Sequence, residues 1–259
     1  MSTGRSAEQI WDEDKRQYHI GLAPGELANR IVTVGDPARA ERIAARFDRV
    51  DIERREREYV TFTGTLEGRP ISVMATGIGC DNTEIAVVET CQIVEEPTFI
   101  RIGSCGALQP EIEIGDLVIS TGAVRLESTS TFFVHEGFPA VAHYDAVQAL
   151  VEAAEDSGYR HHVGITATAA GFYGAQGRKG LGFEPRDPEL PEKLAKMGVK
   201  NFEMEASALF TLCAMRGFVA GAVCTAFANR PRNEFVGKDE KETAEDRAID
   251  VGLAAIQML

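Results

Sequence analysis

The segment from Gly35 to Arg39 has the residue types of an anion-binding turn. It follows the apolar run Ile31–Val34, and Pro37 is typical of the first turn of a helix. A helix N-terminus offers free N–H groups to an anion, and Arg39 would add a charge-assisted contact from the same turn. A plainer interpretation stays open, in which the segment is a simple strand-to-helix turn and Arg39 points into solvent.

Arg101 is the second candidate for binding an anion. It stands within the apolar run Thr98–Ile102, where a guanidinium is costly unless it is paired. Gly103, Ser104 and Gly106 follow at the carboxyl end of the expected strand, the edge at which open α/β sheets bind ligands. Arg101 therefore pairs either with a bound anion at this edge or with an acidic side chain of the protein.

Three later segments carry side chains suited to a nucleoside. Gln176, in the irregular segment Gly171–Pro191, has an amide that both donates and accepts, as the edge of a nucleobase does. Glu203 and Glu205 open an expected helix; residues two apart do not share a helical face, so we expect only one to reach the hydroxyls of a sugar. Asn229-Arg230 follows an apolar strand. Each segment also fits a plainer interpretation: a loop, a helix-terminal charge and a surface arginine.

The sequence lacks the usual cofactor patterns. Gly77 and Gly79 precede an expected helix, but Asn82 replaces the third glycine of a dinucleotide fingerprint. No P-loop, Cys-x-x-Cys or His-Glu-x-x-His pattern occurs, so we expect neither a nicotinamide cofactor nor a metal. Among the five cysteines Cys105 stands out by its glycine neighbours. The other four are expected to be buried thiols or loop residues.

The composition is that of an acidic globular protein. The chain has 259 residues, of which 44% are hydrophobic and 26% charged, and its net charge is −13. Nucleic acids and anionic membranes attract cationic surfaces, so neither is an expected partner. No apolar run reaches the roughly 20 residues that span a bilayer, and the N-terminal residues lack the apolar stretch of a signal peptide. We expect a cytoplasmic protein.

The elements that would position these residues alternate between short strands and helices. This alternation predicts a mixed, largely parallel sheet between helices, and Glu67-Gly68 predicts a tight hairpin. We expect a polar extension at residues 1–17 and one domain at 18–259. The expected strands are Ile31–Val34, Tyr59–Leu66, Pro70–Ala75, Thr98–Ile102, Asp116–Val124, Val163–Thr168 and Val219–Phe227, and the expected helices are Pro37–Phe47, Asn82–Glu95, Asp145–Ser157, Phe202–Arg216 and Glu240–Leu259.

Taken in order, these segments resemble the nucleoside phosphorylase-I family and, within it, the uridine phosphorylases. The similarity runs from Tyr18 to the C-terminal helix and rests on Gly-Asp-Pro-x-Arg, Arg-Ile-Gly-x-x-Gly-Ala, Phe-Tyr-x-x-Gln-x-Arg, Glu-Met-Glu and Asn-Arg. It implies a three-layer α/β/α fold with a twisted mixed central sheet, partly barrel-like. It also implies a homohexamer, built as a trimer of dimers, in which active sites are shared between neighbouring subunits.

The activity implied by the resemblance is phosphorolysis of uridine to uracil and ribose 1-phosphate in nucleoside salvage, with deoxyuridine as a further candidate substrate. Inorganic phosphate is then a co-substrate, and no other cofactor is expected. The resemblance also implies the site residues by position. Phosphate contacts Gly35, Arg39, Arg101 and Ser104, with Arg57 donated by the adjacent subunit. Ribose contacts Met204 and Glu205, with His19 from that neighbour, and the base contacts Cys105, Gly106, Phe172, Gln176, Arg178 and Arg230.

The implied mechanism needs neither a metal nor a covalent enzyme intermediate. Phosphate stabilises and then captures an oxocarbenium-like sugar, while Arg178 and Arg230 stabilise the negative charge that develops on the leaving base. Arg101, Arg178 and Arg230 are therefore the expected catalytic residues.

The sequence departs from the uridine phosphorylase pattern at two places. Cys105 replaces a usual threonine, and Ser-Cys-Gly resembles the purine phosphorylases of the same superfamily, although Phe227–Arg230 lacks the aspartate of those enzymes. Glu58 and Ile78 match a potassium site of some members, but Asn82 replaces its serine, so that ion stays open. Three alternatives are a guanosine or inosine phosphorylase, a nucleosidase that uses water, and a non-catalytic nucleoside-binding protein.

Overall fold

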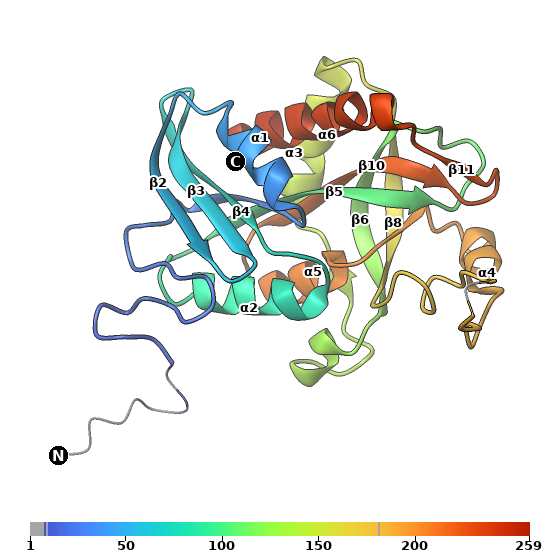
Figure 1. Ribbon diagram of the computed structural model, residues 1–259, viewed down its shortest axis with the longest axis horizontal. Coiled ribbons are helices and arrows are strands. Elements are labelled where there is room, and N and C mark those ends of the chain that lie inside the picture. Colours follow the sequence, from blue (N-terminus) through green and yellow to red (C-terminus); the bar gives the residue numbers. More distant parts are fainter. Residues whose placement is uncertain (1–7, 9, 181) are drawn as a thin grey trace.

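The computed structural model of the chain describes residues 8, 10–180 and 182–259 (Figure 1). Of the expected extension at 1–17, residues 1–7 and 9 lie outside the described residues. Within its remainder, Arg16 forms an ion pair of 2.6 Å with Glu26, and Gln17 is buried. The described residues include no helix that is both long enough and apolar enough to cross a membrane.

The strands form one eleven-stranded mixed sheet, part of which is closed. Strands β10, β6, β8, β9 and β5 are neighbours in that order, and β10 also pairs with β5, so these five strands make a barrel. Strands β1, β4, β3 and β2 extend the sheet outward from β5. The strands are β1 (Arg30–Val34), β2 (Arg49–Glu56), β3 (Tyr59–Leu66), β4 (Arg69–Ala75), β5 (Thr98–Ala107), β6 (Leu117–Leu126), β7 (Ala140–Val141), β8 (His161–Ala169), β9 (Asn201–Glu203), β10 (Ala220–Asn229) and β11 (Glu234–Phe235).

Helices cover the sheet in two layers, as Figure 1 shows. Helices α1, α3 and α6 pack on one side over a core that includes Ile100 and Ile102, and α2 and α5 pack on the other side over Phe99. Full burial of each such side chain contributes roughly 1.5–3 kcal/mol. The helices are α1 (Pro37–Ala44), α2 (Cys80–Thr90), α3 (Tyr144–Asp156), α4 (Leu190–Lys196), α5 (Ala206–Arg216) and α6 (Lys238–Met258), with the 3-10 helix η1 (Thr129–Phe132).

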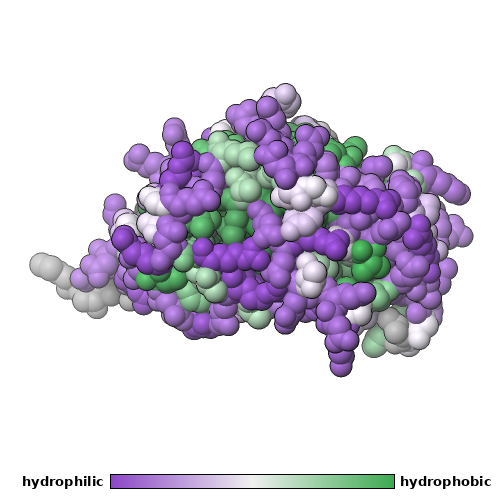
Figure 2. Space-filling view, turned by 90° about the horizontal axis from the view of Figure 1, so that it is seen from above, coloured by the Kyte–Doolittle hydropathy of each residue, from purple (hydrophilic) through white to green (hydrophobic). Residues whose placement is uncertain are grey.

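The three-layer α/β/α architecture with a partly closed sheet confirms the predicted fold class. Each of the seven expected strands and five expected helices overlaps an observed element. The hairpin at Glu67-Gly68 is also present: both residues have positive φ, +52° and +74°, as a tight turn between antiparallel strands requires. The face seen from above in Figure 2 is mostly hydrophilic with smaller hydrophobic areas.

Two expectations about local structure are wrong, and both concern the site. The strand predicted to end at Ile102 continues to Ala107, because β10 and then β9 supply hydrogen-bonding partners along that length. Phe202 and Glu203 do not open a helix; they belong to β9, which pairs with β5 and β8, and α5 begins only at Ala206. Long-range strand pairing, which local sequence does not encode, decides both boundaries.

The topology brings the functional segments to one edge. Strands β4, β1, β5 and β10 are parallel neighbours, so their carboxyl ends meet at the same side of the sheet. The turn after β1, the second half of β5 and the end of β10 therefore lie together. Strand β9 and the start of α5 join them through the pairing of Gly106 with Phe202.

Candidate active site

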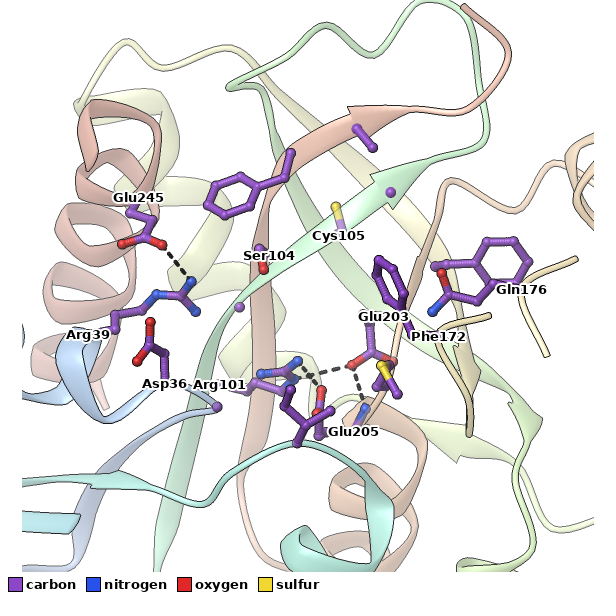
Figure 3. A pocket seen from close by; sticks show the side chains of 18 of the residues that line it. Asp36, Arg39, Arg101, Ser104, Cys105, Phe172, Gln176, Glu203, Glu205 and Glu245 are labelled. Carbon is purple, nitrogen blue, oxygen red and sulfur yellow. Dashed lines mark hydrogen bonds and ion pairs between the residues drawn. The ribbon is translucent and has the colours of Figure 1, made fainter. Parts of the chain in front are cut away.

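A cavity of about 550 Å³ opens at this edge of the sheet (Figure 3). Figure 3 shows Arg39 at one end, Phe172 and Gln176 at the other, and Arg101 between them. The cavity brings together all but three of the predicted site residues: Gly35, Arg39, Arg101, Ser104, Cys105, Gly106, Phe172, Gln176, Arg178, Met204 and Glu205. Its volume is within the range of small-molecule sites, roughly 300–1,000 Å³.

Arg101 is buried and lies between two carboxylates. It is two residues after Phe99 in β5, so its side chain leaves the same face of the strand, toward the start of α5. Its Nε donates to Glu203 Oε2 at 3.2 Å, and its Nη2 donates to Glu205 Oε2. The guanidinium folds back over Gly103, where a Cβ would lie 3.0 Å from Arg101 Cζ, so only glycine leaves this space.

Arg101 keeps its positive charge although it is buried. Burial lowers the pKa of its guanidinium, but the carboxylates of Glu205 and Glu203 outweigh burial, and the net pKa is above the ordinary value. Both interpretations that the sequence left open are therefore compatible: Arg101 is held by acidic partners and also lines the cavity.

Glu203 and Glu205 both line the cavity but have different surroundings. Glu203 accepts hydrogen bonds from Thr168 Oγ1, from Arg101, and from two backbone N–H groups at 2.8 Å, and its side chain has no exposed area. Glu205 accepts from Gly79 N at 2.7 Å and from Arg101. Burial raises the pKa of Glu205, and Arg101 opposes the rise. Glu205 has fewer fixed partners, which favours it for a ligand.

Arg39 is held at the opposite end of the cavity by a residue that sequence analysis missed. It is buried in the first turns of α1, a helix that Asp36 caps by accepting from Ala38 N at 2.9 Å. Its Nη1 donates to Ile102 O at 3.2 Å, and its Nη2 donates to Glu245 Oε1 at 2.9 Å. Glu245 lies on α6, 206 residues away, so no local signal links the two.

A ladder of ion pairs joins α6 to α1 and the turn after it. Arg42 contacts Glu245 and Asp246, and Arg46 contacts Asp246 and Asp250. The spacing of these acids on the C-terminal helix is the only sequence signal that could have identified Glu245. Arg39 is therefore positioned by an interhelical contact rather than directed into solvent.

The third cluster consists of Phe172, Gln176 and Arg178, from the irregular segment after β8. The Arg178 guanidinium lies 3.6 Å from the centre of the Phe172 ring, and its Nη1 donates to Gln176 Oε1 at 2.7 Å. Burial, together with the charge of Arg230, lowers the pKa of Arg178 to about 10. An aromatic face, a buried amide and a cation thus meet at one wall, a set suited to a planar polar ring.

Cys105 lies in the middle of the cavity as a buried thiol. A hydrogen bond with Cys224 and burial raise the pKa of the Cys105 thiol well above its ordinary value. The thiol is therefore neutral near pH 7, unlike the thiolate of a nucleophilic cysteine. All five cysteines are free: three others are buried and Cys91 is half-buried.

Arg230 lines a second cavity of about 790 Å³ rather than the first. It follows the last residue of β10, as the sequence predicts, and its Cγ lies 3.7 Å from the position that a Cβ on Gly106 would take. The two cavities adjoin, because Phe172, Arg178, Ala228 and Phe235 line both. Arg230 is thus next to the base-suited wall, close enough to Arg178 to lower its pKa.

His19 and Arg57 lie outside both cavities but close to each other. Tyr18 is between them, with its ring 4.8 Å from the His19 ring and 4.8 Å from Arg57 Cζ. His19 Nδ1 is 2.5 Å from Glu89 Oε1, and Arg57 is exposed in the turn between β2 and β3. This chain's own fold therefore does not bring either residue to the cavity.

Of the residues suggested for potassium, Ile78 lines the cavity, whereas Glu58 and Asn82 do not. Glu58 is exposed in the turn after β2, and Ile78 is 72% exposed. Asn82 Nδ2 lies beside Gly77 at the start of α2. Across residues 8, 10–180 and 182–259, no group of three or more His, Cys, Asp or Glu side chains is arranged to hold a metal ion.

Comparison with known proteins gives close matches over nearly the whole chain. Residues 29–257 match the Phosphorylase superfamily. A protein of Thermococcus kodakarensis named uridine phosphorylase is 48% identical over 92% of this chain and 87% of its own length. The Escherichia coli protein of that name is 38% identical over 93% and 97%. A guanosine phosphorylase of Halorubrum lacusprofundi is 34% identical over 91% and 92%.

Proposed function

The chain belongs to the phosphorylase superfamily, and on this premise we propose that it splits uridine with inorganic phosphate into uracil and ribose 1-phosphate. One observation carries the proposal: a single cavity contains Arg39 at one end, Gln176 with Arg178 at the other, and Arg101 between them. Glu205 lies between these ends and suits the sugar hydroxyls. Relatives named uridine phosphorylase, at 48% and 38% identity, support the assignment.

The charges of the cavity suit a reaction in which the glycosidic bond breaks before the new bond is complete. Phosphate held by Arg39, Arg101 and Ser104 would face the sugar and stabilise its developing positive charge. At the other end, Arg178 would stabilise the negative charge on the leaving uracil. Cys105 would contact the base only as a neutral thiol. Phosphate then captures the sugar at C1′, and the uracil anion takes up a proton.

The site is proposed to be completed by a neighbouring subunit. In this chain the cavity is lined by four cationic side chains, Arg39, Arg101, Arg178 and Lys241, and four carboxylates, Asp36, Glu203, Glu205 and Glu245. These charges balance formally, whereas a phosphate dianion calls for excess positive charge. Arg57 and His19 lie together, outside the cavity of their own chain. We propose that they enter the site of an adjacent subunit, within a hexamer built as a trimer of dimers.

A cytoplasmic location is part of the proposal. Its support is the cysteine chemistry: five free thiols, of which Cys105 and Cys224 are in contact, suit a reducing compartment.

The second candidate is cleavage of guanosine or inosine. Cys105 in the cavity and the guanosine phosphorylase relative favour it. Against it, Phe227 and Ala228, at the end of β10, bring no carboxylic acid that could protonate a leaving purine, and Gln176 and Arg178 suit a pyrimidine. The pyrimidine is therefore the preferred base.

A panel of nucleosides assayed with and without phosphate tests the proposal. Uridine should release uracil only when phosphate is present. Release without phosphate would identify a nucleosidase, faster cleavage of guanosine or inosine would identify a purine phosphorylase, and binding without release of base would identify a binding protein. Any of these three results would overturn the assignment.

A further inference from the structure

The second cavity, of about 790 Å³, is not used by the proposed reaction. It lies between the irregular segment after β8, the first residues of α4 and the turn after β10. Phe172, Arg178, Ala228 and Phe235 separate it from the first cavity, since these residues line both. A ligand group that extends past the base would therefore enter this second space.

The cations of the second cavity form no direct ion pair with an acidic side chain of the described residues. Within the described part of the chain no ion pair joins Arg178, Lys179 or Arg230 to a carboxylate. Arg39 and Arg101, at the phosphate end of the first cavity, are both paired. No direct ion pair among the described residues therefore neutralises the positive charge at the far wall of the base site.

Among these cations, Arg230 most clearly lacks a hydrogen-bond acceptor. Its Nη1 is buried and has no hydrogen-bond partner among the described residues. Burial lowers the pKa of Arg230, and burial together with Arg230 lowers that of Arg178. A buried N–H of a cation without an acceptor costs stability, and the guanidinium would recover part of that cost by turning this N–H toward an anion in the cavity.

Two carboxylates, Glu192 and Glu234, also line the cavity, but neither is within ion-pair distance of the three cations. Glu192 only raises the pKa of Arg230 through space, against the larger effect of burial. The walls therefore retain one positive charge in excess, with an open volume in front of it.

We propose that the second cavity is an anion-binding subsite formed by Arg178, Lys179 and Arg230, which takes a carboxylate or phosphoryl group next to the bound base. The anion is either a substituent of the base itself or a free ion that binds beside it. This inference rests on the proposed base site of the first cavity. It extends that site from a neutral uracil to bases that carry an acidic group.

The test compares acidic and neutral bases of nearly the same shape. Calorimetric titration would measure binding of 5-carboxyuracil and 6-carboxyuracil, each against its carboxamide, in the full-length protein. We expect at least one carboxylate to bind about tenfold more tightly than its carboxamide, as one charge-assisted hydrogen bond provides. The ratio of the two affinities cancels any general weakening of the base site.

Variants locate the effect in the proposed cavity. Lys179→Gln and Arg230→Gln should each bring the ratio toward one. Arg232→Gln removes the same charge from an exposed residue two positions away that lines neither cavity, so the ratio should be unchanged.

A second experiment tests whether the bound anion is a free ion rather than a substituent of the base. If acetate tightens the binding of uracil to the wild type but not to Lys179→Gln, the subsite is confirmed for a free ion. Equal binding of acid and amide together with no effect of acetate would overturn the proposal. Failure of the proposed function appears separately, as an absence of phosphate-dependent uridine cleavage, because the titrations do not depend on turnover.

Discussion

At the level of single residues, the arginines of the cavity differ in how their charge is balanced. Arg39 and Arg101 are buried and paired with carboxylates, whereas Arg178 is half-buried and rests on Phe172 and Gln176. A paired buried cation contributes to stability as well as to binding, because its removal leaves a buried charge. An unpaired cation at a cavity wall is available for a ligand. Substitutions at the two kinds of arginine should therefore have different consequences.

Arg178→Ala should reduce turnover of uridine by about 100- to 1000-fold, the usual effect of losing one donor to a developing anion. The melting temperature should change little, because no carboxylate loses its partner. Steady-state kinetics and thermal unfolding measure the two quantities. Arg186→Ala, on the same segment but exposed and outside both cavities, is the matched control and should retain activity. Near wild-type turnover in Arg178→Ala would refute its role.

Arg101→Ala should lose both activity and stability. Glu203 and Glu205 would remain buried without their cation, which costs about 3–5 kcal/mol of the free energy of unfolding. Chemical denaturation measures this loss, and the phosphate dependence of the residual activity shows whether phosphate binding fails. An unchanged midpoint of unfolding would contradict the paired arrangement, and near wild-type turnover would contradict the phosphate role.

Glu245→Ala should raise the KM for phosphate about tenfold, with a smaller change in the KM for uridine, because Arg39 loses the charge-assisted contact that orients it. Glu245→Gln keeps an acceptor oxygen for Arg39 and should be much less impaired. Asp246→Asn changes the same ladder without lining the cavity and is the control. Equal impairment of the Ala and Gln variants would show that charge, not orientation, is what matters.

Most of the candidate site could be predicted from the sequence, because its residues stand in short motifs at strand ends. The partners of those residues could not. Glu245 comes from α6 and contacts Arg39 across the fold. The expectation that the spacing of Glu203 and Glu205 would separate them rested on a helix that does not begin until Ala206. Both carboxylates contact Arg101, one from β9 and one from the turn that follows.

At the level of elements, strands with continuous apolar runs were predictable and edge strands were not. Strand β2, Arg49–Glu56, carries mostly charged residues and, in the described part of the chain, pairs only with β3, so half of its backbone groups need no partner there. Such an edge needs no hydrophobic pattern and resists pairing with other chains. Strand β9 is not an edge strand, but it has only three residues, and its pairing with β5 and β8 defines it.

The contact between Arg16, in the N-terminal segment, and Glu26, in the loop before β1, should make the free energy of unfolding depend on pH. The hydrogen bond from Arg16 outweighs burial and lowers the pKa of Glu26 below its ordinary 4.5. The unfolded chain then binds the proton more tightly, so this contribution is complete above about pH 4.5 and is lost as the pH falls through the folded pKa.

Denaturation of wild type and Glu26→Gln at several pH values measures this contribution. The difference in the free energy of unfolding between them should be largest at neutral pH and should shrink in acid. A difference that is constant with pH would show that Glu26 is not linked to a proton.

At the level of the whole molecule, the proposed sharing of sites can be tested by complementation. Arg57→Ala and Arg101→Ala should each be nearly inactive. When the two variants are unfolded together and reassembled, about half of the subunit pairs are mixed, and one of the two sites in each mixed pair has both arginines. About a quarter of the wild-type activity should therefore return. If each subunit instead used its own Arg57, mixing would restore nothing. Cross-linking and light scattering would measure the size of the assembly independently.

The closure of the sheet also bears on synthesis of the chain at the ribosome. Strand β5 is complete at Ala107, but its neighbours β9 and β10 are made only around residues 201–229. Until then, β1 pairs with β5 over Thr98–Arg101 while the partners that β9 and β10 supply are missing, and Arg101 lacks both of its carboxylates. Ligand binding should therefore begin late and abruptly during translation, and fragments that stop before β10 should need a chaperone.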